Sequence, residues 1–250
     1  QPHRIDIPGI READYEVPSS VLSIDGRLHM VFTTGSDGFG PEAKVQMRRS
    51  VMAVSDDDGR TWDNLYTLSQ ADGDDFTNTR FINVAMLRQS AGVEVTHLPE
   101  AVRHDPVFVW GTGEYRKSRV YLAVAAADQL DQPGSLHYWV GLGGDGLPQW
   151  SSEEADASPI FDAAFTGEVS AIYLPQIQRY AITYVIESPD VSERGTFLRF
   201  TENPWRGYGA PQKIFDPWRD RGYTEFMHVS DSFGRLDNVY DPGREFTWGG

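Results

Sequence analysis

The chain has 250 residues, no cysteine and a formal net charge of −15 at pH 7. This acidic balance argues against a nucleic-acid or anionic-membrane partner, and the lack of cysteine excludes disulfides and thiolate metal sites. No apolar run reaches the ~18 residues that a membrane helix needs, so we expect no membrane span.

Almost every segment of the chain reads as a β-strand, and the first four predicted strands form one unit. The first two flank Asp25-Gly26, a dipeptide typical of two-residue hairpin turns. A polar loop over residues 35–48 separates them from the other two. The predicted strands span residues 17–24, 27–34, 50–55 and 64–68. Four strands in about fifty residues is the size of one blade of a β-propeller.

The turn between the third and fourth predicted strands carries the motif Ser-Asp-Asp-Asp-Gly-Arg-Thr-Trp at residues 55–62. Asp57 can accept hydrogen bonds from turn N–H groups, Gly59 can adopt a positive φ, and Trp62 can fold back over the hairpin. Ser-x-Asp-x-Gly-x-Thr-Trp is the Asp box, which recurs between the outer two strands of blades in sialidase-like β-propellers. The alternative is an ordinary acidic turn. Since the motif is structural, it indicates the fold and not the chemistry.

Two similar units follow, and a fourth begins at residues 226–229. In the third unit, Asn203-Pro204-Trp205 occupies the place of the Asp box. An acidic loop at residues 72–75 is interpreted as a solvated linker and not as a cation site. The predicted strands of the second and third units span residues 81–87, 107–110, 120–125, 136–142, 169–174, 180–186, 196–201 and 210–215.

The expected fold is therefore all-β: a β-propeller of which this chain covers about three blades plus the start of another. A propeller closes on itself to remove its sheet edges, and closure takes at least ~4 blades. We therefore expect residues 1–250 to form a single propeller domain that is incomplete at its N-terminus, with the C-terminus as a second candidate for continuation.

Several ordered segments resemble one bacterial family. They are residues 17–30, the Asp box, residues 81–84, residues 111–123, Pro204-Trp205 and residues 214–219. Together they resemble a domain of unknown function, DUF4185, some of whose members are endo-acting D-arabinanases. The resemblance spans about residues 17–248 and implies the architecture of five-bladed propeller furanosidases. Family members carry another upstream blade with an acidic motif on its inner strand, and nothing before Asp14 matches it. If that blade supplies a catalytic carboxylate, this chain lacks it.

Propeller geometry predicts which loops gather at the ligand face. If the first strand of each blade leaves that face, the Asp box lies at the opposite end, and the second-to-third loops and inter-blade connections form the face. These loops span residues 35–48, 69–80, 114–118, 188–195 and 217–225. The residues that open the inner strands are expected to line the central funnel: Glu16, Arg80, Asn83, Glu168, Glu225 and His228.

Glycoside hydrolysis needs two carboxyl groups that flank the scissile bond, one protonated and one ionised. Converging inner strands can hold such groups ~5–10 Å apart. Glu168 is the first candidate for the general acid, because it opens an inner strand; Glu225 and Glu16 follow as catalytic candidates. The alternative for Glu168 is a structural role, in which it caps a strand or pairs with an arginine.

The substrate-binding candidates come from the funnel and the ligand-face loops. They are Arg80, Asn83, Glu114, Tyr115, Arg116, Tyr223 and His228. The arginines can bind sugar hydroxyls or form structural ion pairs, and the aromatic residues, Trp218 included, can stack on sugar rings or pack in the protein. His228 can hold an ion or water, or occupy the core. We expect no cofactor and predict no metal ligands, although a central structural cation stays open.

These features favour a glycoside hydrolase, endo-D-arabinanase-like, that cleaves a furanose-containing polysaccharide by carboxylate acid–base catalysis. The alternative is a non-catalytic carbohydrate- or protein-binding propeller. The sequence has no Gly-x-Ser-x-Gly elbow, no His-Glu-x-x-His zinc motif and no phosphate-binding glycine loop. The arginine triad of a sialidase is not identifiable. The expected partner is a polysaccharide or oligosaccharide, and a secreted or cell-surface location is favoured over a cytoplasmic one.

Overall fold

The computed structural model describes residues 5, 7, 8, 10, 16–35, 47–89 and 92–222. These residues form strands β1 to β13 and four short 3-10 turns, η1 to η4. The fold is all-β, as predicted. No helix in the described part of the chain is long and apolar enough to cross a membrane.

The first unit is an antiparallel meander in the order β1-β2-β3-β4. Its strands are β1 (Glu16–Ile24), β2 (Arg27–Thr34), β3 (Arg49–Ser55) and β4 (Asp63–Gln70). The hairpin between β1 and β2 turns through Asp25 and Gly26, whose φ angles are 51° and 88°. Positive φ at both central residues is what a type I′ hairpin turn requires, so the dipeptide determines the register of this hairpin.

The second unit contains one strand more than predicted. Its strands are β5 (Asn83–Arg88), β6 (Pro106–Thr112), β7 (Ser118–Ala126), β8 (His137–Leu142) and β9 (Pro148–Ser151). Strand β9, which pairs with β8, forms the outer edge of the unit. The 3-10 turns η1 (Glu100–Val102), η2 (Ala127–Gln129) and η3 (Glu154–Asp156) lie in the connections of this unit.

The third unit consists of β10 (Phe161–Leu174), β11 (Arg179–Ile186), β12 (Gly195–Thr201) and β13 (Gln212–Phe215), with η4 (Val191–Glu193) between β11 and β12. Strand β10 begins at Phe161 and not near residue 169 as predicted. Its first half pairs with β7, through Phe161↔Val120 and Thr166↔Ser118, and a register shift follows between Thr166 and Val169. This pairing joins the second and third units into one nine-stranded sheet.

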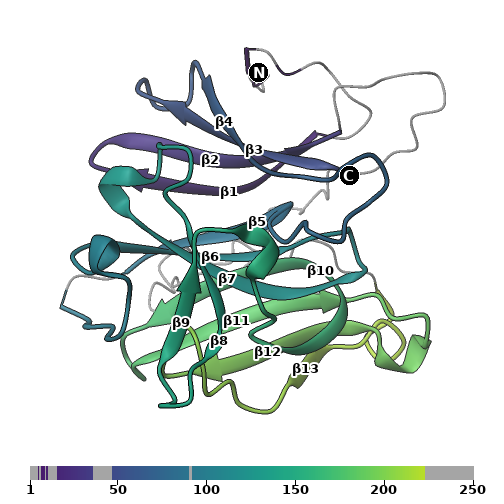
Figure 1. Cartoon of the computed structure of the whole chain (residues 1–250). Coiled ribbons are helices and arrows are strands. Elements are labelled where there is room, and N and C mark those ends of the chain that lie inside the picture. Colours follow the sequence, from purple (N-terminus) through teal and green to yellow (C-terminus); the bar gives the residue numbers. More distant parts are fainter. Residues whose placement is uncertain are drawn as a thin grey trace, which may run out of the picture.

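The three units follow one another as the blades of a propeller do (Figure 1). The first strand of the second unit, β5, packs against the first strands of both neighbours, β1 and β10. In Figure 1 the blade β1–β4 lies at the top, β5, β6 and β7 lie in the middle and β10–β13 lie toward the bottom, with β8 and β9 at the lower left. The predicted start of a fourth unit at residues 226–229 lies outside the described residues.

The described residues form three buried clusters: one lies on each face of the middle blade, and the third contains Met30, Phe32 and Val51 of the first blade. Along β6, Val107 and Val109 pack toward the first blade, whereas Phe108 and Trp110 pack toward the third, and all four side chains are fully buried. This period-2 alternation is that of a strand covered on both faces. Burial of each such side chain stabilises the fold by about 1.5–3 kcal/mol, so inter-blade packing is the main cohesive contribution.

The turn at residues 55–62 lies between β3 and β4, where the motif predicted it. The carboxylate of Asp57 accepts two hydrogen bonds from Thr61, one from its N–H and one from its hydroxyl, both at 2.8 Å. It accepts a third from the N–H of Arg60 at 3.0 Å. Gly59 has φ +80°, and the buried Trp62 donates its indole N–H to the Gly59 carbonyl at 3.1 Å. Hydrogen bonds from Thr61, then Ser55, lower the pKa of Asp57 to about 2.

Candidate functional site

The strand register brings the starts of the inner strands to one end of the sheets. Glu16 of β1 pairs with Thr34 at the end of β2, and Asn83 of β5 pairs with Thr112 at the end of β6. The Thr112 hydroxyl donates a 2.8 Å hydrogen bond to the carbonyl of Gly167, next to Glu168. We call this end, where Glu16, Asn83 and Glu168 lie, the site end.

Glu168 is a buried carboxylate at the site end, with only 6% of its surface exposed. It follows Gly167 inside the register shift of β10, which takes these two residues out of the regular pairing with β11. A Cβ atom on Gly167 would lie 3.0 Å from Cγ of Arg116, so the absence of a side chain allows the β6–β7 turn to approach β10 closely. The bulge therefore directs Glu168 toward that turn.

Two of the predicted substrate-binding residues contact Glu168. The hydroxyl of Tyr115 donates a 2.7 Å hydrogen bond to Oε1 of Glu168, and Nη2 of Arg116 lies 3.6 Å from the same oxygen. The Arg116 guanidinium also stacks over the Tyr115 ring, 4.6 Å from its centroid. Both residues come from the turn between β6 and β7, where Arg116 adopts a φ of +58°.

The second oxygen of Glu168, Oε2, is buried and accepts no hydrogen bond from the described part of the chain. An ionised buried carboxylate normally has several donors, and each missing one costs free energy. One oxygen of Glu168 is thus fixed by Tyr115 while the other is left for a different donor or for proton transfer.

A second group of predicted residues lines a cavity of about 390 Å³ between the loops at residues 69–80 and 114–118. Arg80 and Glu114 both contribute to its lining. The Arg80 guanidinium lies 5.1 Å above the centroid of the Tyr121 ring, and Glu114 forms a 2.5 Å ion pair with Lys117. Two of the loops that propeller geometry assigned to the ligand face therefore border one pocket.

Asn83 belongs to neither group, since it is only 2% exposed. Its side-chain carbonyl accepts a 3.3 Å hydrogen bond from the Thr33 hydroxyl, and its amide nitrogen lies 3.5 Å from the sulfur of Met47. These contacts hold β5 against the first blade. Glu225, Tyr223, His228 and the side chain of Glu16 lie outside the described residues.

The sequence matches the family described as "Domain of unknown function (DUF4185)" over residues 7–234. The chain belongs to this family. No curated protein matches the sequence of this DUF4185 chain.

The solved structures similar to the DUF4185 chain include glycosidases of family 43. A β-xylosidase/α-arabinofuranosidase from a compost microbial metagenome, in complex with xylotriose, is 11% identical with a TM-score of 0.50; 88% of this chain and 68% of that chain are covered. At that identity the likeness shows the fold alone, that of a β-propeller glycosidase.

Two weaker matches have lower TM-scores. An α-L-arabinanase of Penicillium chrysogenum complexed with arabinobiose is 13% identical, with a TM-score of 0.38 and coverage of 80% of this chain and 66% of that one. A family 43 arabinoxylan arabinofuranohydrolase of Bacillus subtilis, in complex with cellotetraose, is 12% identical, with a TM-score of 0.36 and coverage of 78% and 51%. The DUF4185 chain thus spans from about half to two thirds of the length of these three structures.

One residue that supports the site of the DUF4185 chain was not predicted from the sequence. Glu154, in η3, accepts hydrogen bonds at Oε1 from the N–H of Arg80 at 2.5 Å, the Ser69 hydroxyl at 2.7 Å and the N–H of Phe81 at 3.2 Å. Burial raises the pKa of Glu154, and the hydrogen bonds oppose that shift. Glu154 follows Glu153 directly in the sequence, and only the tertiary fold distinguishes the two.

The acidic loop at residues 72–75 is held by its own contacts. Asp72 and Asp75 pair as an isolated bridge, Asp74 forms an ion pair with Arg48, and the Asp75 carboxylate accepts the N–H of Thr77 at 2.8 Å. Within the described ranges, no group of three or more His, Asp or Glu residues is placed to hold a metal ion.

Proposed function

We propose that this DUF4185 chain belongs to a glycoside hydrolase that cleaves a furanose-containing polysaccharide of the arabinan type. The observation that carries the proposal is the state of Glu168: buried at the site end, held at Oε1 by Tyr115, and with Oε2 accepting no hydrogen bond from the described residues. The likeness in fold to a family 43 glycosidase supports it. The contacts of Asp57 and Trp62 support the interpretation of their turn as an Asp box.

In the proposed hydrolysis mechanism, Glu168 is the general acid. It donates a proton to the glycosidic oxygen while the bond from that oxygen to the anomeric carbon breaks, and a second carboxylate assists attack at the anomeric carbon. Water supplies the hydroxyl group of the new reducing end. Glu225 and Glu16 are the candidates for the second carboxylate, because the sequence pattern predicts that both open inner strands of the propeller. Tyr115 acts by fixing the orientation of the Glu168 carboxyl group.

The cavity between the loops at residues 69–80 and 114–118 is the proposed site for a neighbouring sugar ring. Its volume of about 390 Å³ is within the range of small-molecule sites. Arg80 and Glu114 supply a donor and an acceptor for sugar hydroxyls, and the Tyr121 ring under Arg80 limits the positions that the guanidinium can take.

The alternative is a non-catalytic carbohydrate- or protein-binding propeller, and one contact favours a non-catalytic role. The distance of 3.6 Å between Arg116 and Glu168 is that of an ion pair, and a buried carboxylate with a cationic partner can have a purely structural role.

Release of reducing sugar from a set of polysaccharides distinguishes the two functions. The set comprises D-arabinan, L-arabinan, arabinoxylan and, as a pyranose control, cellulose. The hydrolase predicts product from at least one furanose-containing polymer and none from cellulose. Retention of the protein on an arabinan affinity gel without any product from the same polymer would favour the binding function.

A further inference from the structure

The strands place the turn after β13 at the site end of the third blade. Phe215, the last residue of β13, pairs with Thr196 of β12, and Gly195 of β12 pairs with Ile186 of β11. Ile186 in turn pairs with Thr166, which stands just before Gly167 and Glu168. The turn at residues 216–222 therefore lies at the same end of the sheet as Glu168.

Trp218, in this turn, is exposed as no other described tryptophan is. Trp218 has 67% of its surface exposed. By comparison, at most 8% is exposed in Trp62, Trp110, Trp139 and Trp205, and Trp150 is half-buried. The described tryptophans elsewhere in the fold are thus used for packing. A large ring left in solvent is available for stacking on a ligand that has an apolar face.

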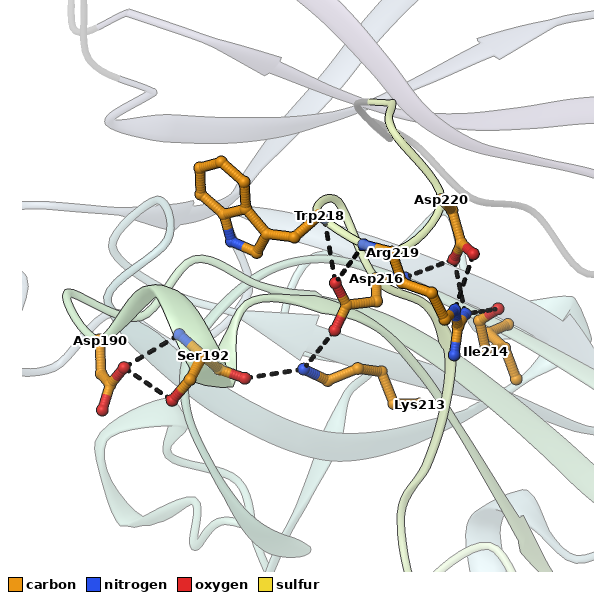
Figure 2. A network of polar contacts seen from close by, with 8 residues as sticks. All are labelled: Asp190, Ser192, Lys213, Ile214, Asp216, Trp218, Arg219 and Asp220. Carbon is orange, nitrogen blue, oxygen red and sulfur yellow. Dashed lines mark hydrogen bonds and ion pairs between the residues drawn. The ribbon is translucent and has the colours of Figure 1, made fainter.

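The backbone that carries Trp218 is nevertheless fixed (Figure 2). Oδ1 of Asp216 accepts the N–H groups of Trp218 and Arg219, both at 3.0 Å, and the Asp220 carboxylate accepts the N–H of Asp216 at 2.8 Å. Lys213 donates to Asp216 at 3.2 Å and to the Ser192 carbonyl at 2.8 Å, which ties the turn to η4. Figure 2 shows the indole ring pointing away from these contacts.

We propose that Trp218 is a stacking platform for a sugar ring of the polysaccharide, at a subsite remote from the bond that is cleaved. A preorganised turn holds the ring without loss of backbone entropy on binding. The residues that fix the turn are charged, namely Lys213, Asp216, Arg219 and Asp220, so groups that can bind hydroxyls lie in the same turn as the ring. A sugar suits this turn, because its apolar face can stack on the indole ring while its hydroxyls bind neighbouring polar groups. The inference rests on the proposed function, because it names a part of the same substrate site.

The test measures binding and turnover separately. Binding to arabinan is measured by affinity gel electrophoresis in a Glu168→Gln background, with and without Trp218→Ala. The platform predicts that Trp218→Ala raises the dissociation constant for the polymer by about tenfold and that Trp218→Phe restores part of the affinity. In the background in which Glu168 is unchanged, Trp218→Ala is expected to raise KM for the polymer and to leave kcat/KM for an aryl arabinofuranoside unchanged. Ile177→Ala, at an exposed residue of the β10–β11 turn at the opposite end, is the control and should change neither.

The outcomes separate this inference from the proposed function. Trp218-dependent binding by a protein that hydrolyses no glycan would support the platform and overturn the hydrolase. Unchanged polymer affinity and kinetics in Trp218→Ala, in a protein that does hydrolyse arabinan, would overturn the platform alone. If the protein that keeps Trp218 binds none of the polymers tested, the platform is overturned as well.

Discussion

Tyr115 and Glu168 meet across two blades: the hydroxyl of Tyr115, from the turn after β6, donates a 2.7 Å hydrogen bond to Oε1 of Glu168 in β10. The two residues are separated by 53 positions in the sequence. Their contact depends on the bulge that displaces Glu168 from the β10–β11 ladder and on the close approach that Gly167 allows. The bond orients a carboxyl group whose other oxygen accepts no hydrogen bond from the described residues.

Tyr115→Phe removes this bond and leaves the ring under Arg116 in place. We expect the free energy of unfolding to fall by about 1–3 kcal/mol, because a buried carboxylate loses its donor. The rate on polysaccharide should fall too, since the carboxyl group loses its orientation. Urea denaturation and initial rates measure the two effects. The control is Tyr66→Phe, which removes a 2.9 Å bond to the neutral carbonyl of Leu130 and should cost less, with no effect on rate. Equal costs and an unchanged rate would contradict the assignment.

Gly59→Ala tests the turn at residues 55–62. Gly59 has φ +80°, and an added Cβ would lie 3.4 Å from the Trp62 ring, so we expect a loss of about 1 kcal/mol or more in unfolding free energy. Activity of the folded variant should not change, because the turn lies at the end opposite to Glu168. Gly144→Ala is a matched control: its φ is not in the left-handed region and its surroundings are open, so its stability should stay near wild type. A Gly59→Ala protein as stable as Gly144→Ala would show that the turn is not strained by a side chain.

The pH dependence of stability tests the hydrogen bonds to Asp57. The folded-state pKa is about 2, below the ordinary 3.8, so the carboxylate stabilises the fold above pH 3.8 and loses that contribution as the pH falls through about 2. Asp57→Asn lacks this titration. We therefore expect the stability difference between wild type and Asp57→Asn to be constant above pH ~4 and to shrink between pH 4 and 2. A difference that is independent of pH over this range would rule out the depressed pKa.

The contribution of Glu154 to the pH dependence of stability has the opposite sign to that of Asp57. Burial raises its pKa above 4.5, so the folded protein binds the proton more tightly, and stability falls as the pH rises from 4.5 through the folded-state value. Glu154→Gln retains an acceptor without the charge and should be at least as stable as wild type at pH 7. Glu154→Ala leaves the N–H groups of Arg80 and Phe81 without their acceptor and should lose about 1–3 kcal/mol. Because Arg80 lines the proposed sugar site, KM for the polysaccharide should rise in Glu154→Ala by a larger factor than kcat falls. Equal behaviour of the Gln and Ala variants would remove Glu154 from this role.

The blades could be predicted from the sequence because their signals are local. The Asp25-Gly26 turn needs only its own dihedral angles, and the alternation of Val107 to Trp110 reflects two buried faces. The first half of β10 carried no such signal. It is a strand because β7 offers a free edge to it, a property of the assembled sheets and not of residues 161–166.

The site was predictable only in part. Propeller geometry places Glu168, Tyr115 and Arg116 at one end of the blades, and the structure brings them into contact. The same reasoning placed Asn83 in the funnel; in the structure it lies at the site end, 2% exposed, and contacts Thr33 and Met47. Whether Trp218 packs or faces solvent depends on the course of the chain after β13, which the sequence pattern does not determine.

The most direct test of the central claim is the rate of Glu168→Gln on unactivated arabinan. Loss of a general acid typically lowers the rate by about 10²–10⁴-fold. The variant should keep its melting temperature, bind the polymer, and recover on an aryl furanoside whose leaving group needs no proton. Glu187→Gln is the matched control, because Glu187 faces Arg194 at 3.8 Å in the same blade and is outside the proposed machinery. The account predicts collapse for Glu168→Gln and near-normal turnover for Glu187→Gln. Near-normal turnover of arabinan by Glu168→Gln would contradict it.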